Sequence, residues 1–133
     1  MRILLLYEPN NPHTIRWAKA LTEAGQKVAV FGFSEFEPEI YKGYDIEVYS
    51  AGIKRTDMRA ASAKLSKIRY LKLLGKVREI INEFKPDILH SFFATSYGLL
   101  GALSGFHPYC ISVLGEDVYL FPKKSFLHKY IFQ

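Results

Sequence analysis

A strand-like stretch at residues 111–114 runs directly into a glycine and two carboxylates, Gly115, Glu116 and Asp117. Carboxylates at the end of an apolar strand can act as general acids or bases, hold a ligand or simply cap a turn. Adjacent residues on an extended chain point in opposite directions, so Glu116 and Asp117 do not form a facing acid–base pair. We therefore expect one carboxylate to reach a site and the other to cap a loop or helix, with Gly115 allowing close backbone approach to a ligand.

A second candidate site is the segment EPNNPHT at residues 8–14, where Asn10, Asn11 and His13 precede or open a helical pattern. Free backbone N–H groups and the dipole at a helix N-terminus favour an anionic or hydroxyl-rich ligand. The alternative is N-capping by Asn11 or Thr14, with His13 on the surface. Taken by itself, capping is the simpler explanation of this segment.

The third candidate is HSFFATSYG at residues 90–98, which places His90 near the end of a buried-type strand and Thr95 just beyond it. A histidine there is either a hydrogen-bonded packing residue or a group that faces a ligand. The four histidines and one cysteine lack the HxxxH, HExxH and CxxC spacings, which argues against a metal site. Phosphate-binding glycine loops and the GxSxG elbow are also missing, which argues against a dinucleotide oxidoreductase, an NTPase or a serine hydrolase.

Hydrophobic periodicity predicts that strands and helices alternate along the chain. Strands are expected at 2–7, 27–33, 45–50, 87–92 and 109–114, and helices near 15–22, 65–84 and 95–105 and from about 121 onward. This order predicts an α/β, Rossmann-like open parallel sheet with helices on both faces, in the spatial order 3-2-1-4-5 and with 45–50 at an edge. Ligands bind such sheets beyond the carboxyl ends of the strands, where the three candidate segments meet. The apolar stripe expected to pack the long helix is Leu65, Ile68, Leu71, Leu74, Val77, Ile81 and Phe84.

The composition is that of one globular domain, with 133 residues, 49% apolar and 23% charged. The single Cys110 lies in an apolar run, so we expect no internal disulfide and a buried thiol. Only five apolar-type residues follow Arg2, and the longest apolar stretch is about half of a membrane span. These features predict a cytoplasmic protein.

The net charge of +5 is concentrated between Lys54 and Lys85, where ten Lys and Arg residues face three acidic ones. Such a segment is either a solvated helix face or a patch for phosphates, nucleic acid or an anionic membrane. The aromatic residues lie in expected strands and core stripes rather than between basic residues on one face, which argues against nucleic acid.

Taken together, three segments resemble a known family. MRILLLYEPNNPHTIRWAKALTEAGQKVAVFGF, KPDILHSFFATSYGLLGAL and YCISVLGEDV match, in order and spacing, the N-terminal domain of retaining glycosyltransferases of the GT-B fold, the group 1 or family 4 enzymes. Within them, PHTIRWAKAL resembles the first loop and helix of that domain. PDILH resembles its Asp-x-x-His strand, and VLGEDV resembles the strand that ends in His-Gly-x-Asp.

The resemblance implies a function. These enzymes have two facing Rossmann-like domains: the first binds mainly the acceptor and the second the nucleotide-sugar donor, and transfer retains the anomeric configuration without a metal or other cofactor. Residues 1–133 would be a single acceptor-side domain, truncated at its C-terminal end, and inactive without the donor-binding domain. The acceptor is expected to be a saccharide or a lipid-linked molecule. Basic parts of this domain often attach such enzymes to an anionic membrane surface, and residues 54–67 fit that peripheral contact.

The resemblance also assigns site residues. The expected substrate-binding residues are Asn10, Asn11, His13, His90, Thr95, Gly115 and Glu116, and the expected catalytic residue is Asp117. Many family members carry a histidine directly before the glycine, where this chain has Leu114, which leaves Asp117 as the polar candidate. The competing hypothesis is a non-catalytic Rossmann-like module that binds a phosphorylated ligand or an anionic membrane surface.

Overall fold

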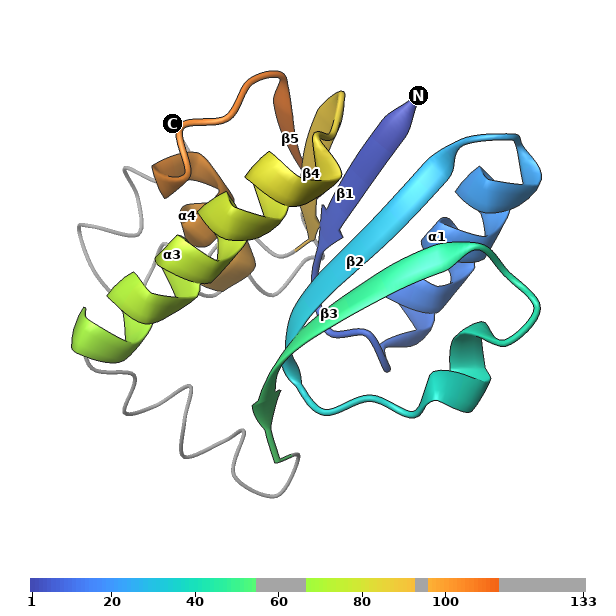
Figure 1. Cartoon of the computed structure of the whole chain (residues 1–133), viewed down its shortest axis with the longest axis horizontal. Helices are drawn as coiled ribbons and strands as arrows, with labels where there is room; N and C mark the ends of the chain where they lie inside the picture. The colour runs from blue at the N-terminus through green and yellow to red at the C-terminus, as the bar shows by residue number, and fades with distance from the viewer. Residues whose placement is uncertain (55–66, 93–95, 113–133) are drawn as a thin grey trace.

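The computed structural model describes residues 1–54, 67–92 and 96–112, and these residues form one parallel sheet with helices on both faces (Figure 1). The elements in chain order are β1 (Arg2–Leu6), α1 (Pro12–Glu23), β2 (Lys27–Ser34), η1 (Pro38–Tyr41), β3 (Ile46–Ile53), α3 (Lys67–Phe84), β4 (Ile88–Phe92), α4 (Ser96–Leu103) and β5 (Tyr109–Ser112). The strand order β3-β2-β1-β4-β5 confirms the order expected from right-handed crossovers, with β3 at an edge. The short helix η1 has no counterpart in the sequence-based prediction.

The first helix shows how sequence sets its boundaries. Asn11 is the N-cap: its side chain accepts a hydrogen bond from the backbone N–H of His13 at 2.9 Å, and Pro12 occupies the first turn. Gly25 follows the helix with φ of +89°, a conformation that favours glycine, and it ends the helix as predicted. Residues 10–13 are therefore held at the carboxyl end of β1 by ordinary capping.

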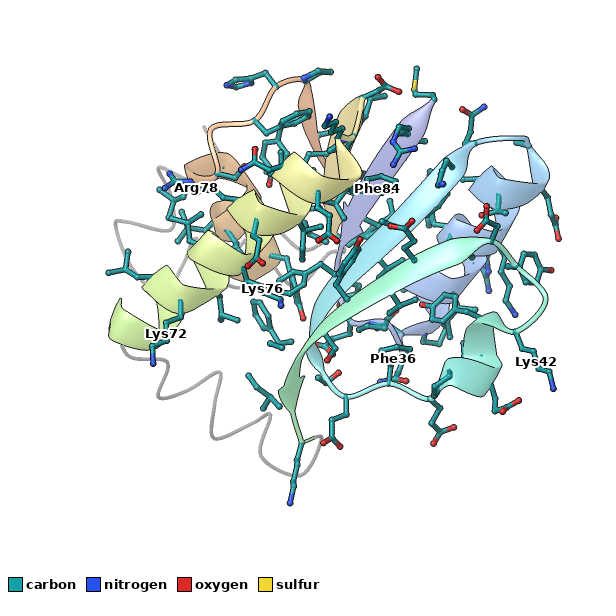
Figure 2. All side chains as sticks on the ribbon, viewed as in Figure 1. Phe36, Lys42, Lys72, Lys76, Arg78 and Phe84 are labelled. Atoms are coloured by element: carbon teal, nitrogen blue, oxygen red, sulfur yellow. The ribbon has the colours of Figure 1, made fainter. Side chains whose placement is uncertain are left out.

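Two apolar layers fix the sheet between the helices. On one face α1 and η1 cover the first three strands, through Ile3, Leu5, Ala18, Val28, Val30 and Tyr41. On the other face α3 and α4 pack against the sheet through a larger cluster, which includes Leu4, Phe31, Val77, Ile80, Phe84, Leu89 and Tyr97. Figure 2 shows Phe84 of α3 turned toward the strands. Alternate residues of β1 feed the two layers, so this strand is covered on both faces, as its continuous apolar run predicts.

Two expectations about single residues are wrong. Leu71 is 64% exposed because it lies about 120° around the helix from Val77, whereas Leu73, Leu74, Val77, Ile80 and Phe84 form the buried stripe of α3. Cys110 is an exposed free thiol rather than a buried one. It lies on the edge strand β5 and pairs with His90, on the sheet face opposite α4.

Candidate functional site

The carboxyl ends of β1 and β2 meet the first turn of α4 around one carboxylate. Glu8, two residues after β1, accepts hydrogen bonds from the side-chain hydroxyls of Ser34 and Tyr97. The Tyr97 hydroxyl also accepts the backbone N–H of Phe33 at 2.9 Å. Burial, then the charge of Glu8 and its hydrogen bond, raise the pKa of Tyr97 well above its usual value, so the phenol stays protonated and can donate. Glu8, Ser34 and Tyr97 form what we call the Glu8 cluster.

The loop that carries the predicted Asn10, Asn11 and His13 is fastened to β2 by close packing and hydrogen bonds. A Cβ atom on Gly32 would lie 2.2 Å from Pro9 Cδ and 2.7 Å from the backbone oxygen of Tyr7, so only glycine allows this approach. Asn10 Nδ2 donates to the backbone oxygen of Glu35 at 2.6 Å. The loop is thus held in one position relative to the end of the sheet.

The three predicted residues of this loop have different environments. Asn11 serves as the helix cap, and the side chain of His13 is exposed at the same edge. Asn10 Oδ1 and Thr14 Oγ1 are both buried, and neither has a hydrogen-bond partner among the described residues. The residue types therefore suit both alternatives raised by the sequence, capping and a polar surface that can meet a ligand.

His90 is the middle residue of β4 and pairs with Leu5, one residue before β1 ends. Its side chain lies on the α1 side of the sheet. Its Nε2 is 2.7 Å from Ser112 Oγ on β5, and its ring packs edge-on against Trp17 with centroids 5.5 Å apart. Burial lowers the pKa of His90, so its imidazole is neutral near pH 7. A neutral ring can both donate and accept hydrogen bonds, as contact with a sugar hydroxyl requires.

The structure brings some predicted site residues together and separates others. Trp17 stands one helical turn after His13 and touches His90, so His13 and His90 border the same side of the sheet. The Glu8 cluster lies on the opposite side, because Tyr97 belongs to the layer formed by α3 and α4. Thr95, Leu114, Gly115, Glu116 and Asp117 lie outside the described residues.

The Glu8 cluster was missed by sequence reasoning. Its signal was weak: a carboxylate just after the first strand, a serine at the end of the second and a tyrosine after the fourth. Each could have been placed at the carboxyl edge from the predicted topology. Their mutual contacts could not, because they join residues 26 and 89 positions apart.

Neither a metal centre nor a membrane span is found in the parts of the chain that the structure describes. Within residues 1–54, 67–92 and 96–112, no three His, Cys, Asp or Glu side chains gather closely enough to bind a metal ion. No helix in these ranges combines the length and hydrophobicity needed to cross a bilayer.

Solved structures share the fold at low sequence identity. The UDP-GlcNAc 2-epimerase of Neisseria meningitidis, in a complex with UDP-GlcNAc, superimposes with a TM-score of 0.58 at 16% identity. The match covers 93% of this chain and 35% of the epimerase, so the chain spans about a third of that protein's length. The C-terminal domain of a hydrogenase from Pyrococcus furiosus gives a TM-score of 0.56 at 16% identity, covering 84% of this chain and 89% of that domain. At these identities the likeness concerns the fold alone.

Sequence comparison identifies the family. No curated protein matches the chain significantly. The model of the family described as glycosyl transferase 4-like, however, matches residues 2–133. This match includes the Glu8 cluster, the capping loop and His90. The chain therefore belongs to the glycosyl transferase 4-like family.

Proposed function

We propose that this chain is the acceptor-side domain of a retaining glycosyltransferase, which moves a sugar from a nucleotide-sugar donor to a saccharide or lipid-linked acceptor. The observation that carries the proposal is the family match over residues 2–133, on a sheet whose carboxyl edge gathers polar side chains. Ligands bind open parallel sheets at this edge, so the fold and the polar residues favour the same place.

In this proposal the nucleotide-sugar is a substrate held mainly by a second, C-terminal glycosyltransferase domain. No metal or other cofactor takes part. The acceptor would lie over the loop of Asn10, Asn11 and His13 and over His90, with Thr95, Gly115 and Glu116 completing its site. The enzyme would work in the cytoplasm, and the basic residues 54–67 would hold it peripherally at the inner face of the membrane. Residues 1–133 alone would not transfer sugar.

Sugar transfer provides the direct test. The isolated chain and a complete two-domain enzyme are incubated with radiolabelled nucleotide-sugars and acceptors, and the product is analysed by NMR for its anomeric configuration. We expect transfer with retention by the complete enzyme and none by the isolated chain. Robust transfer by the isolated chain would refute the division of labour, and an inverted product would refute the retaining mechanism.

Asp117 is the residue to change first. In the complete enzyme, Asp117→Asn should lower kcat by at least about a hundredfold, the usual scale for losing a group that handles a proton or a developing charge. Glu39→Gln, an exposed change on η1, serves as the control and should leave kcat unchanged. An Asp117→Asn enzyme as active as the wild type would remove Asp117 from the catalytic site.

A second candidate is a non-catalytic module that binds a phosphorylated ligand or an anionic membrane. The basic side of α3 favours it, because Lys72 and Lys76 have no carboxylate within 4.0 Å among the described residues. Calorimetry of the isolated chain with nucleotides and with anionic vesicles separates the two candidates. Tight nucleotide binding by this chain alone would favour the module, because our main proposal assigns the nucleotide to the other domain.

A further inference from the structure

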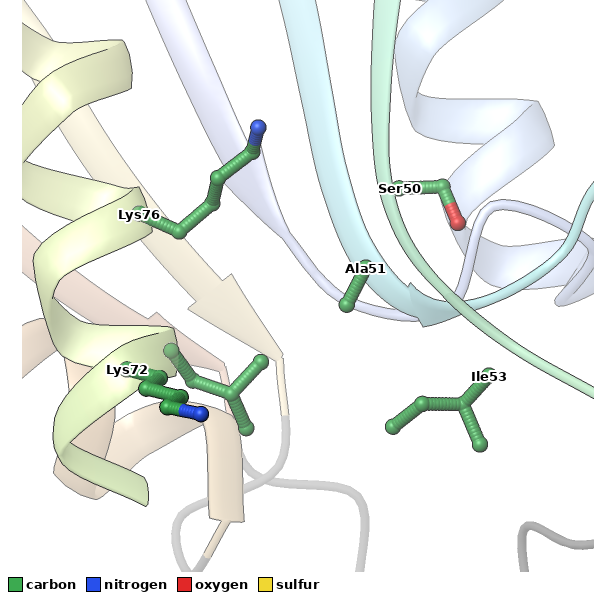
Figure 3. A pocket seen from close by; sticks show the side chains of 6 residues that line it. Ser50, Ala51, Ile53, Lys72 and Lys76 are labelled. Carbon is green, nitrogen blue, oxygen red and sulfur yellow. The ribbon is translucent and has the colours of Figure 1, made fainter. Parts of the chain in front are cut away.

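A pocket of about 290 Å³ opens between β3 and α3, on the sheet face opposite α1 (Figure 3). Its lining consists of Ser50, Ala51, Ile53, Lys72, Leu73 and Lys76. The first three come from the carboxyl half of β3 and the others from the first ten residues of α3. The pocket is therefore at the same edge of the sheet as the Glu8 cluster, and Ser50 is linked to that cluster by its hydrogen bond to the backbone oxygen of Ser34 at 2.6 Å.

The charge of this pocket comes from two lysines on one side of a helix. Lys72 and Lys76 are four residues apart, so their Cβ atoms are about 6 Å apart and their flexible stems can bring both ammonium groups to one ligand. Figure 3 shows both side chains extending from α3 on the side that faces β3. Two like charges at this spacing oppose each other and disfavour the helix. A bound anion would remove that repulsion.

The residues that the structure describes supply no anion at this pocket. Among the described residues, no carboxylate lies within 4.0 Å of either ammonium group, and this includes Glu79, three residues after Lys76. Arg78 differs from these lysines, since its guanidinium donates to the backbone oxygen of Leu103 at the end of α4 (Figure 2). Among the α3 side chains that the structure describes, Lys72 and Lys76 are therefore the cations that can bind a ligand in the pocket.

Acidic groups lie on the same two elements, β3 and α3, farther from the carboxyl edge of the sheet. Tyr49 donates to Glu47 at 2.8 Å, and burial, followed by Glu47 and Glu83, raises the pKa of this tyrosine to about 12. Glu83 is seven residues after Lys76, or about 10 Å along the helix axis. Arg2 lies among these acidic groups, since its charge lowers the pKa of Tyr49 and its Nε donates to the backbone oxygen of Phe84. The two lysines of the pocket, by contrast, have no carboxylate within 4.0 Å among the described residues.

From this arrangement we infer that the pocket is a phosphate subsite of the acceptor site, held by Lys72 and Lys76, and that the acceptor carries a phosphate group. That the ligand is an acceptor rests on the proposed function, whereas the binding of a phosphate group rests on the pocket alone. Lysine binds phosphate as a compact point charge, and Ile53 and Leu73, which are nearly buried, form an apolar part of the pocket lining. Ser50 is committed to Ser34 and Gly52, so it shapes the pocket rather than binding the ligand.

The first test is NMR titration of the whole 133-residue chain with inorganic phosphate and with pyrophosphate. We expect the amide signals of residues 50–53 and 72–76 to shift, and Lys72→Gln/Lys76→Gln to weaken binding by about tenfold or more. The matched control is Lys27→Gln/Lys42→Gln, which removes two exposed lysines elsewhere and should change binding little. Equal weakening in both double variants would overturn the inference, because the effect would then be one of net charge.

Two further variants separate the pocket from its charge. Ala51→Phe keeps every charge but fills the pocket from the exposed face of β3, and it should also abolish phosphate binding. Lys72→Arg/Lys76→Arg should retain most of the binding. Thermal unfolding of each variant checks that it is folded. Unchanged binding in Ala51→Phe would overturn the subsite.

The source of the phosphate is decided with vesicles and with transfer. Vesicles of phosphatidylcholine with and without phosphatidylglycerol are compared with the soluble phosphates. If the lysine variant weakens binding both to anionic vesicles and to soluble phosphates, the phosphate belongs to a lipid headgroup. If it weakens binding to soluble phosphates alone, the acceptor is a soluble phosphorylated molecule. If it weakens binding to the vesicles alone, the lysines form a membrane contact and the phosphate subsite is refuted.

Failure of the subsite differs from failure of the proposed function. If the complete enzyme carrying Lys72→Gln/Lys76→Gln transfers sugar to phosphorylated acceptors at the wild-type kcat/KM, the subsite is refuted and the glycosyltransferase stands. If the complete enzyme transfers no sugar while the lysines still bind phosphate, the pocket stands as an anion site and the acceptor assignment is refuted.

Discussion

Two parts of the sheet differ in how firmly their side chains are held: β2, next to the edge strand β3, which we call the covered end, and the β5 edge, which we call the open end. At β2 both faces are covered, and Phe31 is fully buried in the core on the α3 side of the sheet. The strand ends there are joined through the Glu8 cluster and the close approach of Pro9 to Gly32. At the β5 end Ile111 is 40% exposed, Cys110 is exposed, and His90 is half-buried beside Trp17, which is itself 43% exposed.

This difference suggests two roles: the covered end holds the binding loop in place, and the open end can contact a ligand. The covered end can hold the loop of Asn10 and His13 in place, because its residues have several partners each. At the open end His90 and Ser112 are half-buried and Trp17 is exposed, all on the α1 side of the sheet. Binding residues on a rigid frame lose less entropy when they meet a ligand, so the covered end contributes to function by fixing geometry.

The largest effect should come from removing a large side chain at the covered end. Phe31→Ala should lower the free energy of unfolding by about 3–5 kcal/mol, since it deletes a fully buried ring. Ile111→Ala at the open end should cost less than about 1 kcal/mol, because that side chain already meets water. Urea unfolding followed by circular dichroism measures both. Similar losses of unfolding free energy in the two variants would show that the two ends of the sheet are equally well packed.

The sequence predicted this contrast only in part. The continuous apolar run 2–7 indicated a strand covered on both faces, and right-handed crossovers predicted the order of the sheet. The stretch 111–114 was of a buried-strand type and Cys110 was expected to be buried, yet the described residues 109–112 are half-buried or exposed, because β5 is an edge strand. Periodicity reports which face is apolar, and not whether a partner covers it.

The candidate site shows a similar limit. The topology placed Asn10, Asn11, His13 and His90 near one edge; the structure has the first three in the loop and first turn after β1 and His90 in the middle of β4. The Glu8 cluster depends on side chains distant in sequence, and the exposure of Leu71 depends on the rotation of α3 about its axis. Neither property follows from local pattern, because both are decided by tertiary packing.

A smaller effect of steric origin is expected at Gly32. Gly32→Ala should destabilise the protein by about 1–3 kcal/mol, since a proline ring and a backbone oxygen would have to move. It should also shift the amide signals of residues 8–13. Gly75→Ala is the matched control: nothing lies within 4 Å of its Cβ position, and a helical Gly-to-Ala change should stabilise α3 by about 0.5–1 kcal/mol. A stabilised Gly32→Ala protein would show that the loop is free to move.

The Glu8 cluster can be tested with two Tyr–Glu pairs that differ in burial. Tyr97→Phe removes a donor from Glu8 and an acceptor from the Phe33 N–H, both in a nearly dry environment, and should cost about 1–2 kcal/mol. Tyr44→Phe removes the same kind of bond, from Tyr44 to Glu23 at 3.0 Å on the surface, and should cause no measurable change. Equal effects in urea unfolding would mean that the cluster adds no rigidity to the edge.

The smallest effect concerns the protonation of His90 at the open end. Burial lowers the pKa of His90 below its usual value near 6.5, so the unfolded chain binds this proton more readily than the native protein. Stability should therefore fall as pH drops through about 6.5, and the fall should end once the pH is below the native pKa. NMR titration of the imidazole signals gives the native pKa, and urea unfolding at several pH values gives the slope.

Two variants make this last measurement specific to His90. His90→Gln removes the proton-binding group and should remove this part of the pH dependence, while His13→Gln leaves His90 in place and should keep it. Among the described residues, the ring contacts Trp17, Phe92 and Ser112, none of which titrates in this range. The pKa of His90 should therefore change with how far its ring is shielded from water. An acceptor that covers His90 would take it further from water and lower its pKa again. A His90 pKa that rises when acceptor binds would instead mean that the ligand brings a negative charge to the open end of the sheet, away from Lys72 and Lys76.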